Sequence, residues 1–375
     1  MIIGFDAKRA FKNRTGLGNY SRMLIGGVSE CDAGMECKLY SPSIEGPFAD
    51  YFSDCVNVEA IVPGALGGLF PHLWRGYGIS RRLSRDGVDI FHGLSHELPH
   101  FIPKRVKKVV TMHDLIVWRY PHLYKMFDRV VYRTKMRHSC KIADIVVAAS
   151  EQTKRDLQDI LLVPEEKIRV VYQSCDPIFW QSVTEEAKSA VRERYHLPQH
   201  YIICVGTIER RKNQAAVVET LAALPDDLHL VIVGGHRTKY YDIMLETIKR
   251  LGLENRVHII DKAVFPDFPA LYSCAEMSMY VSEFEGFGIP VLESMCCDIP
   301  VITSNLSSMP EVGGEAALYV NPNDTNDIAE KAFQILNNAD LCANLVSKGR
   351  EQRQKFTSAK ISQQILSIYR ELLCD

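Results

Sequence analysis

Short apolar runs and longer amphipathic segments alternate along almost the whole chain. The runs at residues 88–93, 143–148 and 201–205 are rich in β-branched and aromatic side chains, and each precedes a polar loop and a helix-like segment. Apolar runs of this kind are typical of strands buried inside a parallel sheet. The alternation therefore predicts an α/β protein in which each strand is followed by a helix.

The alternation runs through the chain twice, with an interruption at residues 173–186 that is interpreted as a linker. A length of 375 residues also suggests more than one domain. We predict a first domain over residues 1–180 and a second over residues 181–357, each with a parallel sheet. Ligands bind at the carboxyl ends of such strands, so the ligand-binding edges of the two sheets are expected to meet across a cleft.

The composition is that of an ordinary globular protein, with 46% hydrophobic and 24% charged residues. The formal net charge of -2 argues against a protein that binds nucleic acid. Basic residues are concentrated between Lys104 and Lys141, where eleven of them accompany only two acidic residues. This segment forms either a solvated helix face or a surface that meets anionic lipid or a phosphate-bearing acceptor.

A second segment, residues 66–83, mixes aromatic and apolar side chains with three arginines. Such a segment either rests on a membrane surface or packs into the core. No apolar run approaches the ~18–20 residues of a membrane span, and the chain starts with a strand-like run in place of a signal peptide. The eleven cysteines include no C-x-x-C pair, so we expect reduced thiols and a cytoplasmic protein.

The strongest chemical signal is the stretch 282–293, Ser-Glu-Phe-Glu-Gly-Phe-Gly-Ile-Pro-Val-Leu-Glu. Its glycine-bearing loop links a strand end to a helix start, a geometry that presents backbone N–H groups and the positive end of a helix to an anion. Gly286 and Gly288 let the backbone approach a ligand closely. Glu285 and Glu293 can each accept hydrogen bonds from hydroxyl groups. A phosphate site beside hydroxyl acceptors suits a sugar nucleotide.

A cationic loop follows the apolar strand at residues 201–205. It contains Gly206, Thr207, Arg211 and Lys212, and it starts at the expected carboxyl end of that strand. Arginine and lysine at this edge of a sheet are well placed to neutralise a diphosphate.

Two further candidates lie in the first half of the chain. His113 stands at the expected carboxyl end of a strand, where ligands bind, although a single histidine is more often a structural residue. Gly16 and Gly18 match half of the dinucleotide fingerprint Gly-x-Gly-x-x-Gly, with Ser21 in place of the third glycine. The loop before them is too long for that fingerprint, so an NAD-type oxidoreductase is kept only as an alternative.

The joint pattern Glu-Gly-Phe-Gly-Ile-Pro-x-Leu-Glu at residues 285–293 resembles the signature of the retaining family 4 glycosyltransferases, which have the GT-B fold. The resemblance covers nearly the whole chain and is strongest at residues 205–311. It implies two Rossmann-like domains with parallel sheets facing across a cleft, the first binding the acceptor and the second the nucleotide-sugar donor. It also implies that the amphipathic segment 358–375 crosses back onto the first domain.

The resemblance also assigns roles. In the family, the first glutamate contacts the transferred sugar and the second contacts the ribose. The histidine approaches the sugar, and the N-terminal glycine loop faces the cleft near the diphosphate and the acceptor. The expected catalytic residues are Lys212, Glu285, His113 and Arg211. The expected donor-binding residues are Gly16, Gly18, Gly206, Thr207, Gly286, Phe287, Gly288, Glu293, Ala263 and Val264. This chain departs from the family at Thr207, where many relatives carry arginine.

The implied reaction is the retaining transfer of a hexose from a GDP- or UDP-linked donor to a hydroxyl of a glycan or lipid-linked acceptor. The family suggests mannose and the assembly of bacterial surface polysaccharides. The leaving phosphate is expected to take the acceptor proton. Neither a cofactor nor a metal is expected, because the chain lacks an Asp-x-Asp element and the cationic loop can replace the ion. Peripheral contact with the inner membrane surface is a further expectation; nucleic acid is not an expected partner.

Three other functions fit parts of the pattern. Another GT-B enzyme, such as a sugar-nucleotide epimerase or a glycan phosphorylase, would share the fold, but phosphorylases need a pyridoxal-binding lysine in a much longer chain. An NAD-type oxidoreductase would use the loop at Gly16. A non-catalytic sugar-nucleotide-binding protein would bind the donor and transfer nothing.

Overall fold

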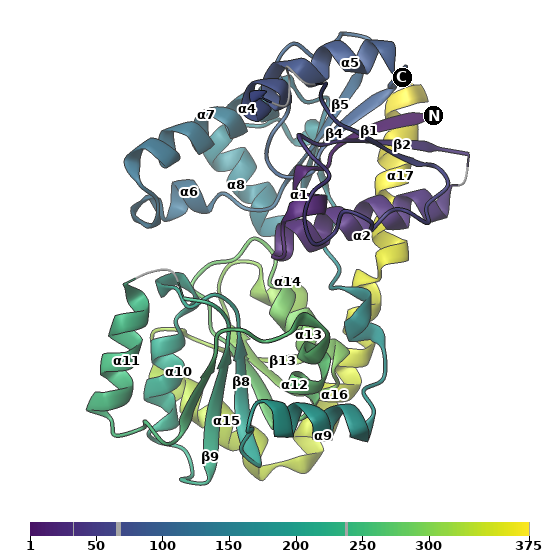
Figure 1. Cartoon of the computed structure of the whole chain (residues 1–375). Helices are drawn as coiled ribbons and strands as arrows, with labels where there is room; N and C mark the ends of the chain where they lie inside the picture. Colours follow the sequence, from purple (N-terminus) through teal and green to yellow (C-terminus); the bar gives the residue numbers. More distant parts are fainter. Residues whose placement is uncertain (33, 65–68, 237–238, 375) are drawn as a thin grey trace. The chain divides into compact units, whose positions relative to one another are not determined.

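The chain forms two compact units, each built around its own parallel sheet (Figure 1). The computed structural model describes residues 1–32, 34–64, 69–236 and 239–374. The first unit contains Met1–Ser174 and Phe356–Asp375, and the second contains Cys175–Lys355.

Most of the predicted linker belongs to the second unit. It contains a short 3-10 helix, η4 (Pro177–Trp180), in which Phe179 is fully buried. The ring centroid of Phe179 lies 6.0 Å from that of Tyr272, and this packing holds the linker on the second unit. The second unit therefore starts at Cys175, before the boundary predicted at residue 181.

The first sheet has seven strands in the order β3-β2-β1-β4-β5-β6-β7. All of its pairings are parallel, as the apolar runs predicted. The strand order reverses direction between β1 and β4, and such a switch point is where open α/β sheets bind ligands. The strands are β1 Ile2–Asp6, β2 Glu36–Tyr40, β3 Val58–Ile61, β4 Ile90–Gly93, β5 Lys107–Met112, β6 Ile145–Ala148 and β7 Ile168–Val170.

Helices surround the first sheet. They are α1 Lys8–Lys12, α2 Gly16–Cys31, α4 Pro71–Leu73, α5 Ile79–Arg85, α6 Ile116–Arg119, α7 Met126–Ile142, α8 Glu151–Leu161 and α17 Ser358–Cys374, with a π-helix, η1 Trp74–Gly78, and the 3-10 helices η2 Pro121–Leu123 and η3 Glu165–Lys167. The aromatic and basic segment predicted at residues 66–83 thus consists of α4, η1 and α5. Residues 66–68 lie outside the described part of the chain.

Helix α1 occupies a stretch that the sequence pattern indicated as a polar loop. Phe11 of α1 is buried in the core of the first unit. Arg22 of α2 donates hydrogen bonds to the carbonyl oxygens of Ala10, at 2.8 Å, and Asn13, at 2.9 Å. These carbonyls lie at the end of α1, where a helix leaves acceptors unpaired. The loop prediction was wrong because the residue that satisfies α1 comes from the next helix.

The C-terminal helix α17 packs into the first unit (Figure 1). Ile361 and Ile365 are buried in the same apolar cluster as Phe5 of β1. Helix α17 also lies against α2, so closely that a Cβ atom at Gly27 would be 2.2 Å from Ser362 Oγ. A glycine at position 27 thus permits the two helices to touch.

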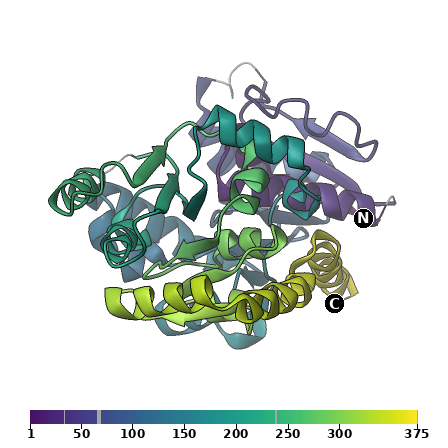
Figure 2. The same ribbon diagram turned by 90° about the horizontal axis from the view of Figure 1, so that it is seen from below.

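The second sheet has six parallel strands in the order β10-β9-β8-β11-β12-β13. Its switch point lies between β8 and β11, and helices cover both of its faces (Figure 2). The strands are β8 His200–Val205, β9 Leu228–Val233, β10 Val257–Ile260, β11 Met277–Tyr280, β12 Val301–Ser304 and β13 Ala317–Val320. The helices are α9 Glu185–Arg194, α10 Gln214–Leu221, α11 Tyr240–Arg250, α12 Phe268–Ser273, α13 Ile289–Cys296, α14 Met309–Gly313, α15 Thr325–Asn337 and α16 Ala339–Gln352, with 3-10 helices η5 Arg210–Lys212, η6 Phe265–Asp267 and η7 Arg353–Phe356.

The two sheets confirm the predicted α/β class with two Rossmann-like domains. That their edges meet across a cleft stays a prediction. All eleven cysteines are free thiols, in agreement with the expected reduced state. Within the ranges that the structure describes, no helix combines the length and apolar character needed to cross a membrane.

A buried hydrogen-bond network ties α17 to the first sheet. The Tyr369 hydroxyl lies 2.6 Å from Nδ1 of His92, and Nε2 of the same ring lies 2.8 Å from Thr111 Oγ1. The Tyr20 hydroxyl is 3.0 Å from that Thr111 oxygen. Burial lowers the pKa of His92 to about 3, so its ring is neutral and needs both partners.

Replacing Tyr369 by phenylalanine should therefore destabilise the first unit. The substitution leaves a buried ring nitrogen of His92 without its partner, which costs roughly 1–3 kcal/mol. Urea unfolding followed by circular dichroism measures the loss. The control is Leu373→Ala, which removes a 43% exposed side chain from the same helix and should change the midpoint little. Equal midpoints for Tyr369→Phe and the wild type would contradict the structural role of the network.

Candidate functional site

The loops after β8 and β11 meet at the switch point of the second sheet. The loop after β8 contains the turn η5, and the loop after β11 carries the predicted glycine stretch. The backbone N–H of Glu283 donates to the carbonyl oxygen of Arg211 at 2.8 Å. Two stretches that lie about 70 residues apart in the sequence are thus joined at the edge where such sheets bind ligands.

Glu285 is held by three side chains from the end of β11 and the two loops. Its Oε1 atom lies 2.6 Å from Arg211 Nη1 and accepts hydrogen bonds from the Tyr280 hydroxyl at 2.5 Å and from Ser282 Oγ at 3.0 Å. Burial by itself would raise the pKa of Glu285, but the charges of Arg211 and Lys212 outweigh it and lower the pKa. Glu285 is therefore an oriented carboxylate that remains ionised at neutral pH.

Arg211 positions Glu285 and has little charge left for a ligand. Its side chain is only 9% exposed and also pairs with Glu209, at 2.5 Å. It donates a further hydrogen bond to the carbonyl oxygen of Phe284. Burial disfavours its charged form, but the two carboxylates hold the pKa of Arg211 above its ordinary value. Of the two cations predicted to neutralise a diphosphate, Arg211 is thus already balanced by protein carboxylates.

Lys212 is the cation that keeps its charge available. Within the described part of the chain its ammonium group forms no ion pair and no hydrogen bond, and it lies 5.7 Å from the centroid of the Tyr280 ring. Gly206 makes room for it, because a Cβ atom there would be 2.6 Å from Lys212 Nζ. Gly206 also has a φ of +137°, which disfavours any side chain. A half-buried cation without a carboxylate partner is suited to bind an anion.

The glycine loop runs directly into helix α13. Gly288 precedes the helix with a φ of +112°, and a Cβ atom at this position would lie 2.6 Å from Met309 Cε. Ser308 Oγ donates to the carbonyl oxygens of Glu285, at 3.0 Å, and Phe287, at 2.7 Å. Gly286 lies between these two residues in the same loop. The loop is thus fixed by side chains of α14 and its approach, with the N-terminal end of α13 beside it.

Glu293 projects from the second turn of α13 into a buried position. Only 8% of the residue is exposed, and its Oε2 atom accepts a hydrogen bond from the Tyr272 hydroxyl at 2.9 Å. Burial raises the pKa of Glu293 to about 7, although the Tyr272 hydrogen bond and the charge of Lys212 act in the opposite direction. Glu293 therefore titrates near neutral pH, and a hydroxyl-bearing ligand would favour its ionised form.

The remaining predicted residues of this unit line the same sheet edge. Thr207 is exposed directly after Gly206, and its carbonyl oxygen accepts a hydrogen bond from Gln214 at 3.0 Å. Ala263 and Val264 follow β10, two strands away from β8. The Val264 N–H donates to the Tyr195 hydroxyl at 3.0 Å, so the protein already uses this backbone donor. That Ala263 and Val264 bind the donor stays a prediction.

His113 belongs to the first unit and is buried. Its Nε2–H group donates to the carbonyl oxygen of Leu94 at 2.8 Å, and its Nδ1 atom accepts from Gln173 Nε2 at 2.7 Å. Burial, followed by the neighbouring His96, lowers the pKa of His113 to about 3. Both ring nitrogens thus have protein partners, and a sugar would have to replace one of them. The predicted contact with the sugar stays a prediction.

Gly16 and Gly18 stand at the start of α2. A Cβ atom at Gly18 would lie 2.0 Å from the carbonyl oxygen of Asn13, whereas a Cβ atom at Gly16 would meet nothing within 4 Å. Gly18 is therefore required for packing against the end of α1. Because α1 stands between β1 and these glycines, the tight turn of a dinucleotide site is missing here.

Sequence reasoning missed the two tyrosines that hold the two glutamates. Tyr280 ends β11 and Tyr272 lies in α12, and both are nearly fully buried. Each lies within an apolar run, where an aromatic residue is first interpreted as core. A phenol hydroxyl in such a run needs a polar partner, and that requirement is the signal that could have revealed them. Among the described residues, no group of three or more His, Cys, Asp and Glu side chains is arranged to hold a metal ion.

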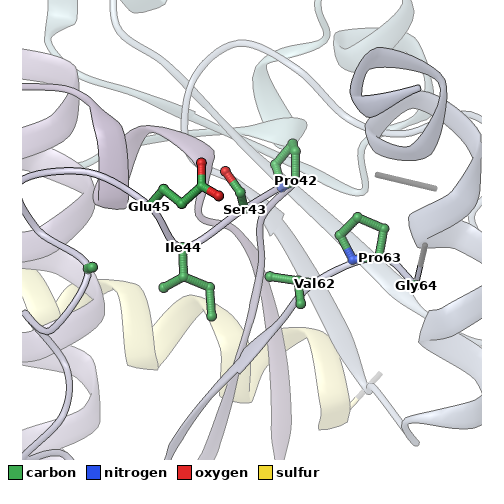
Figure 3. A pocket seen from close by; sticks show the side chains of 8 residues that line it. Pro42, Ser43, Ile44, Glu45, Val62, Pro63 and Gly64 are labelled. Atoms are coloured by element: carbon green, nitrogen blue, oxygen red, sulfur yellow. The ribbon is translucent and has the colours of Figure 1, made fainter. Parts of the chain in front are cut away.

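A pocket of about 560 Å³ opens on the first unit. Figure 3 shows that its wall comes from the loops that follow β2 and β3. Apolar side chains form most of this wall, with one carboxylate. The lining residues are Pro42, Ser43, Ile44, Glu45, Ala49, Val62, Pro63 and Gly64. The predicted site residues are not among them.

Two family models match the chain in succession. The family described as "Glycosyltransferase Family 4" matches residues 15–178, within the first unit except for its last four residues. The family described as "Glycosyl transferases group 1" matches residues 188–352, within the second unit. The second match contains both loops of the site described above.

Curated relatives of similar length point to the same group. The chain is 29% identical to O-antigen chain mannosyltransferase B of Escherichia coli over 294 residues, which are 77% of this chain and 76% of the relative. It is 28% identical to the O-antigen chain mannosyltransferase RfbU of Salmonella typhimurium over 346 residues, 89% of each chain.

Solved structures share the fold across the whole chain. Sucrose-phosphate synthase from Thermosynechococcus elongatus superposes with a TM-score of 0.79 at 21% identity and covers 100% of this chain and 99% of its own. Anabaena HepE in complex with UDP-glucose gives a TM-score of 0.77 at 19% identity, covering 99% of both chains. The two parallel sheets, the successive family matches and the mannosyltransferase relatives agree: this chain belongs to the family 4-like bacterial glycosyltransferases with the GT-B fold.

Proposed function

We propose that the chain transfers a hexose from a nucleotide-diphosphate sugar to a hydroxyl of a glycan or lipid-linked acceptor, with retention of configuration. The observation that carries the proposal is the unpaired Lys212 ammonium group, placed at a switch point beside two carboxylates whose pKa values it influences. The E. coli and Salmonella relatives are O-antigen mannosyltransferases, which favours mannose and a polysaccharide acceptor. The HepE complexes contain UDP or UDP-glucose, which favours a nucleotide-sugar donor.

In this proposal each group has one task. Lys212 balances the negative charge that grows on the leaving diphosphate as the bond from the anomeric carbon to phosphate oxygen breaks. Glu285, oriented by Arg211 and Tyr280, accepts hydrogen bonds from the sugar hydroxyls. Glu293 accepts a hydrogen bond from the ribose. The acceptor oxygen forms its bond on the same face of the sugar, and its proton passes to the leaving phosphate.

We also propose that the transfer needs neither a metal nor another cofactor. The ammonium group of Lys212 supplies positive charge at the place where a divalent ion would act in a metal-dependent transferase. The arrangement around α1 and Gly18 lacks the tight dinucleotide turn and does not favour an NAD-type oxidoreductase. A non-catalytic protein would bind the same donor, so transfer itself must be measured.

A surface of the first unit supports peripheral contact with the inner membrane from the cytoplasm. Met126, Phe127 and Val130 at the start of α7 are 73%, 78% and 58% exposed, among the basic residues of that helix. On α4 and its approach, Leu69, Phe70 and Leu73 are 71%, 61% and 59% exposed. Helix α7 contacts η1, which follows α4, through the stacked rings of Tyr77 and His100 and the neighbouring ring of His138, which lies near the C-terminal end of α7. Exposed apolar side chains beside cations suit an anionic lipid surface.

Lys212→Ala should weaken the binding of nucleoside diphosphates by roughly 10- to 100-fold, because it removes a partly buried cation that no described carboxylate pairs. Thermal shifts with UDP, GDP, ADP and their sugars, repeated in EDTA, measure the effect and identify the base. Arg210→Ala is the matched control, since Arg210 is an exposed cation in the same turn. The proposal fails if no diphosphate stabilises the wild type, or if Lys212→Ala responds as the wild type does.

Glu293→Gln should change how stability depends on pH. The pKa of Glu293 is about 7 in the folded protein, against an ordinary 4.5. Between these values the unfolded chain loses the proton first, so wild-type stability falls as pH rises from 4.5 to 7, by up to about 3 kcal/mol. Glu293→Gln should be the more stable protein at pH 8 and equal at pH 4.5.

Unfolding midpoints of the two proteins across this pH range test the expectation, with the exposed Glu254→Gln as control. The donor experiment runs in parallel, because a ribose hydroxyl favours the ionised carboxylate. Nucleotide affinity of the wild type should therefore rise through pH 7 and be weak in Glu293→Gln. Parallel stability curves for Glu293→Gln and the wild type would refute the buried, near-neutral titration.

Replacing Met126 and Phe127 together by serine should abolish co-sedimentation with vesicles that contain phosphatidylglycerol, since it removes the apolar contacts and keeps the basic residues. Vesicles of phosphatidylcholine alone should bind the wild type weakly, because they lack the negative charge. Val56→Ser removes a fully exposed apolar side chain elsewhere in the first unit and should bind like the wild type. If the wild type does not co-sediment with vesicles that contain phosphatidylglycerol, membrane contact through this surface is excluded.

A further inference from the structure

A second cluster of cations lies at the switch point of the first sheet and has no role in the transfer proposed above. Lys8 and Arg9 follow β1, and the segment from Leu94 to Glu97 follows β4. The Nε group of Arg9 donates to Ser95 Oγ at 3.1 Å and so joins the two segments. Because β1 and β4 are the neighbouring strands where the order reverses, this place corresponds to the Lys212 site of the second sheet.

The acidic groups of this cluster are already paired. Arg75 lies 2.6 Å from the Asp6 carboxylate and 2.8 Å from that of Glu97. Glu97 also pairs with Lys135 at 3.1 Å. The carboxylates of Asp6 and Glu97 thus pair with Arg75 and Lys135. The charges of Lys8 and Arg9 come in addition to these pairs.

Neither Lys8 nor Arg9 has an ion-pair partner among the described residues. Both are partly buried, and the terminal nitrogens of Arg9 make no hydrogen bond within the described chain. Burial, followed by the charge of Arg75, lowers the pKa of Lys8. The charges of Asp6 and Glu97 act in the opposite direction on Lys8 but do not outweigh these effects, so both cations are held partly out of water where a bound anion would stabilise them.

His96 adds a third unsatisfied group. Its Nδ1 atom is buried and has no hydrogen-bond partner in the described part of the molecule. Its backbone has a φ of +65°, a left-handed conformation that is uncommon for histidine. Burial, followed by the charge of Arg9, lowers its pKa to about 3, so the ring is neutral and can present an N–H group at Nδ1.

We infer that Lys8, Arg9 and His96 bind a phosphate group carried by the sugar acceptor. The inference rests on the proposed transferase function and names the class of its acceptor. A phosphate offers several acceptor oxygens and negative charge, which match an ammonium group, the free side of a guanidinium group and an imidazole N–H. The diphosphate of the donor has its own cation in Lys212 of the second unit, so the first unit serves a second anion.

The first unit also has the apolar pocket of Figure 3, which Lys8, Arg9 and His96 do not line. Its loop lies against α1, since a Cβ atom at Gly46 would be 3.0 Å from the carbonyl oxygen of Phe11. The phosphate that Lys8 and Arg9 bind belongs either to a soluble sugar phosphate or to a lipid-linked acceptor. The common chemistry is the phosphate, and the experiment separates the two sources.

The test compares the wild type, Lys8→Ala/Arg9→Ala and the control Lys12→Ala, which removes an exposed cation from the same helix. Each protein is first saturated with the nucleoside diphosphate that stabilises it most. Glucose 6-phosphate, and separately a polyprenyl phosphate in detergent micelles, are then titrated in, with glucose and empty micelles as blanks. At least one phosphate probe should raise the melting temperature of the wild type and of Lys12→Ala, and the double variant should bind it at least tenfold more weakly.

Measuring nucleoside diphosphate binding by the same proteins distinguishes the proposed donor site from the inferred acceptor phosphate site. The double variant should bind the nucleoside diphosphate with the same affinity as the wild type. If its affinity for the nucleotide falls as much as its affinity for the phosphate probe, the inference is overturned, because Lys8 and Arg9 would then bind the donor. If the wild type binds nucleotide but neither phosphate probe, the inference fails and the donor site stands. Should the double variant not fold, Lys8→Gln alone must still weaken the phosphate probe, or the inference is wrong.

Discussion

The ion pair between Arg211 and Glu285 sets the geometry of the second unit's site. It joins the turn after β8 to the loop after β11, with 2.6 Å between Nη1 and Oε1, and both side chains are largely withdrawn from solvent. Removing one partner of such a pair leaves the other charge buried and uncompensated, at a cost of roughly 3–5 kcal/mol. The pair therefore holds the two loops in one arrangement, and it places the carboxylate of Glu285 beside the ammonium group of Lys212.

The two adjacent cations of this turn, Arg211 and Lys212, have different roles: the first holds the loops together and the second is available to bind a ligand. The planar guanidinium group of Arg211 donates hydrogen bonds to Glu209, to Glu285 and to a carbonyl oxygen. Lys212 makes none of these contacts and leans over the glycine that follows β8. A sequence shows only Arg-Lys at these positions. Their different roles depend on which of the two side chains faces the neighbouring strand, and only the assembled sheet determines that.

The alternation of apolar runs was sufficient to predict two parallel sheets, and the stretch 282–293 was sufficient to predict a glycine loop between a strand end and a helix start. Both signals are local. The partners of His113 could not be predicted, because Leu94 and Gln173 reach it from 19 and 60 residues away in the sequence. The helix α1 was missed for the same reason, since Arg22 satisfies its last carbonyls from the following helix. Local periodicity carries no information about such contacts.

Net charge says little about what this protein binds, and the local balance of charge says more. The whole chain carries -2, yet each sheet has, at its switch point, partly buried cations that no described carboxylate pairs. Parallel strands create this situation, because they deliver successive loops to one edge and withdraw the side chains there from water. An unpaired cation at such an edge makes the free protein less stable than a paired one would. When an anion binds, it supplies the charge partner that the cation lacks in the free protein, and this interaction contributes favourable free energy of binding. The partly buried cations without a protein partner are therefore the positions best suited to bind phosphate.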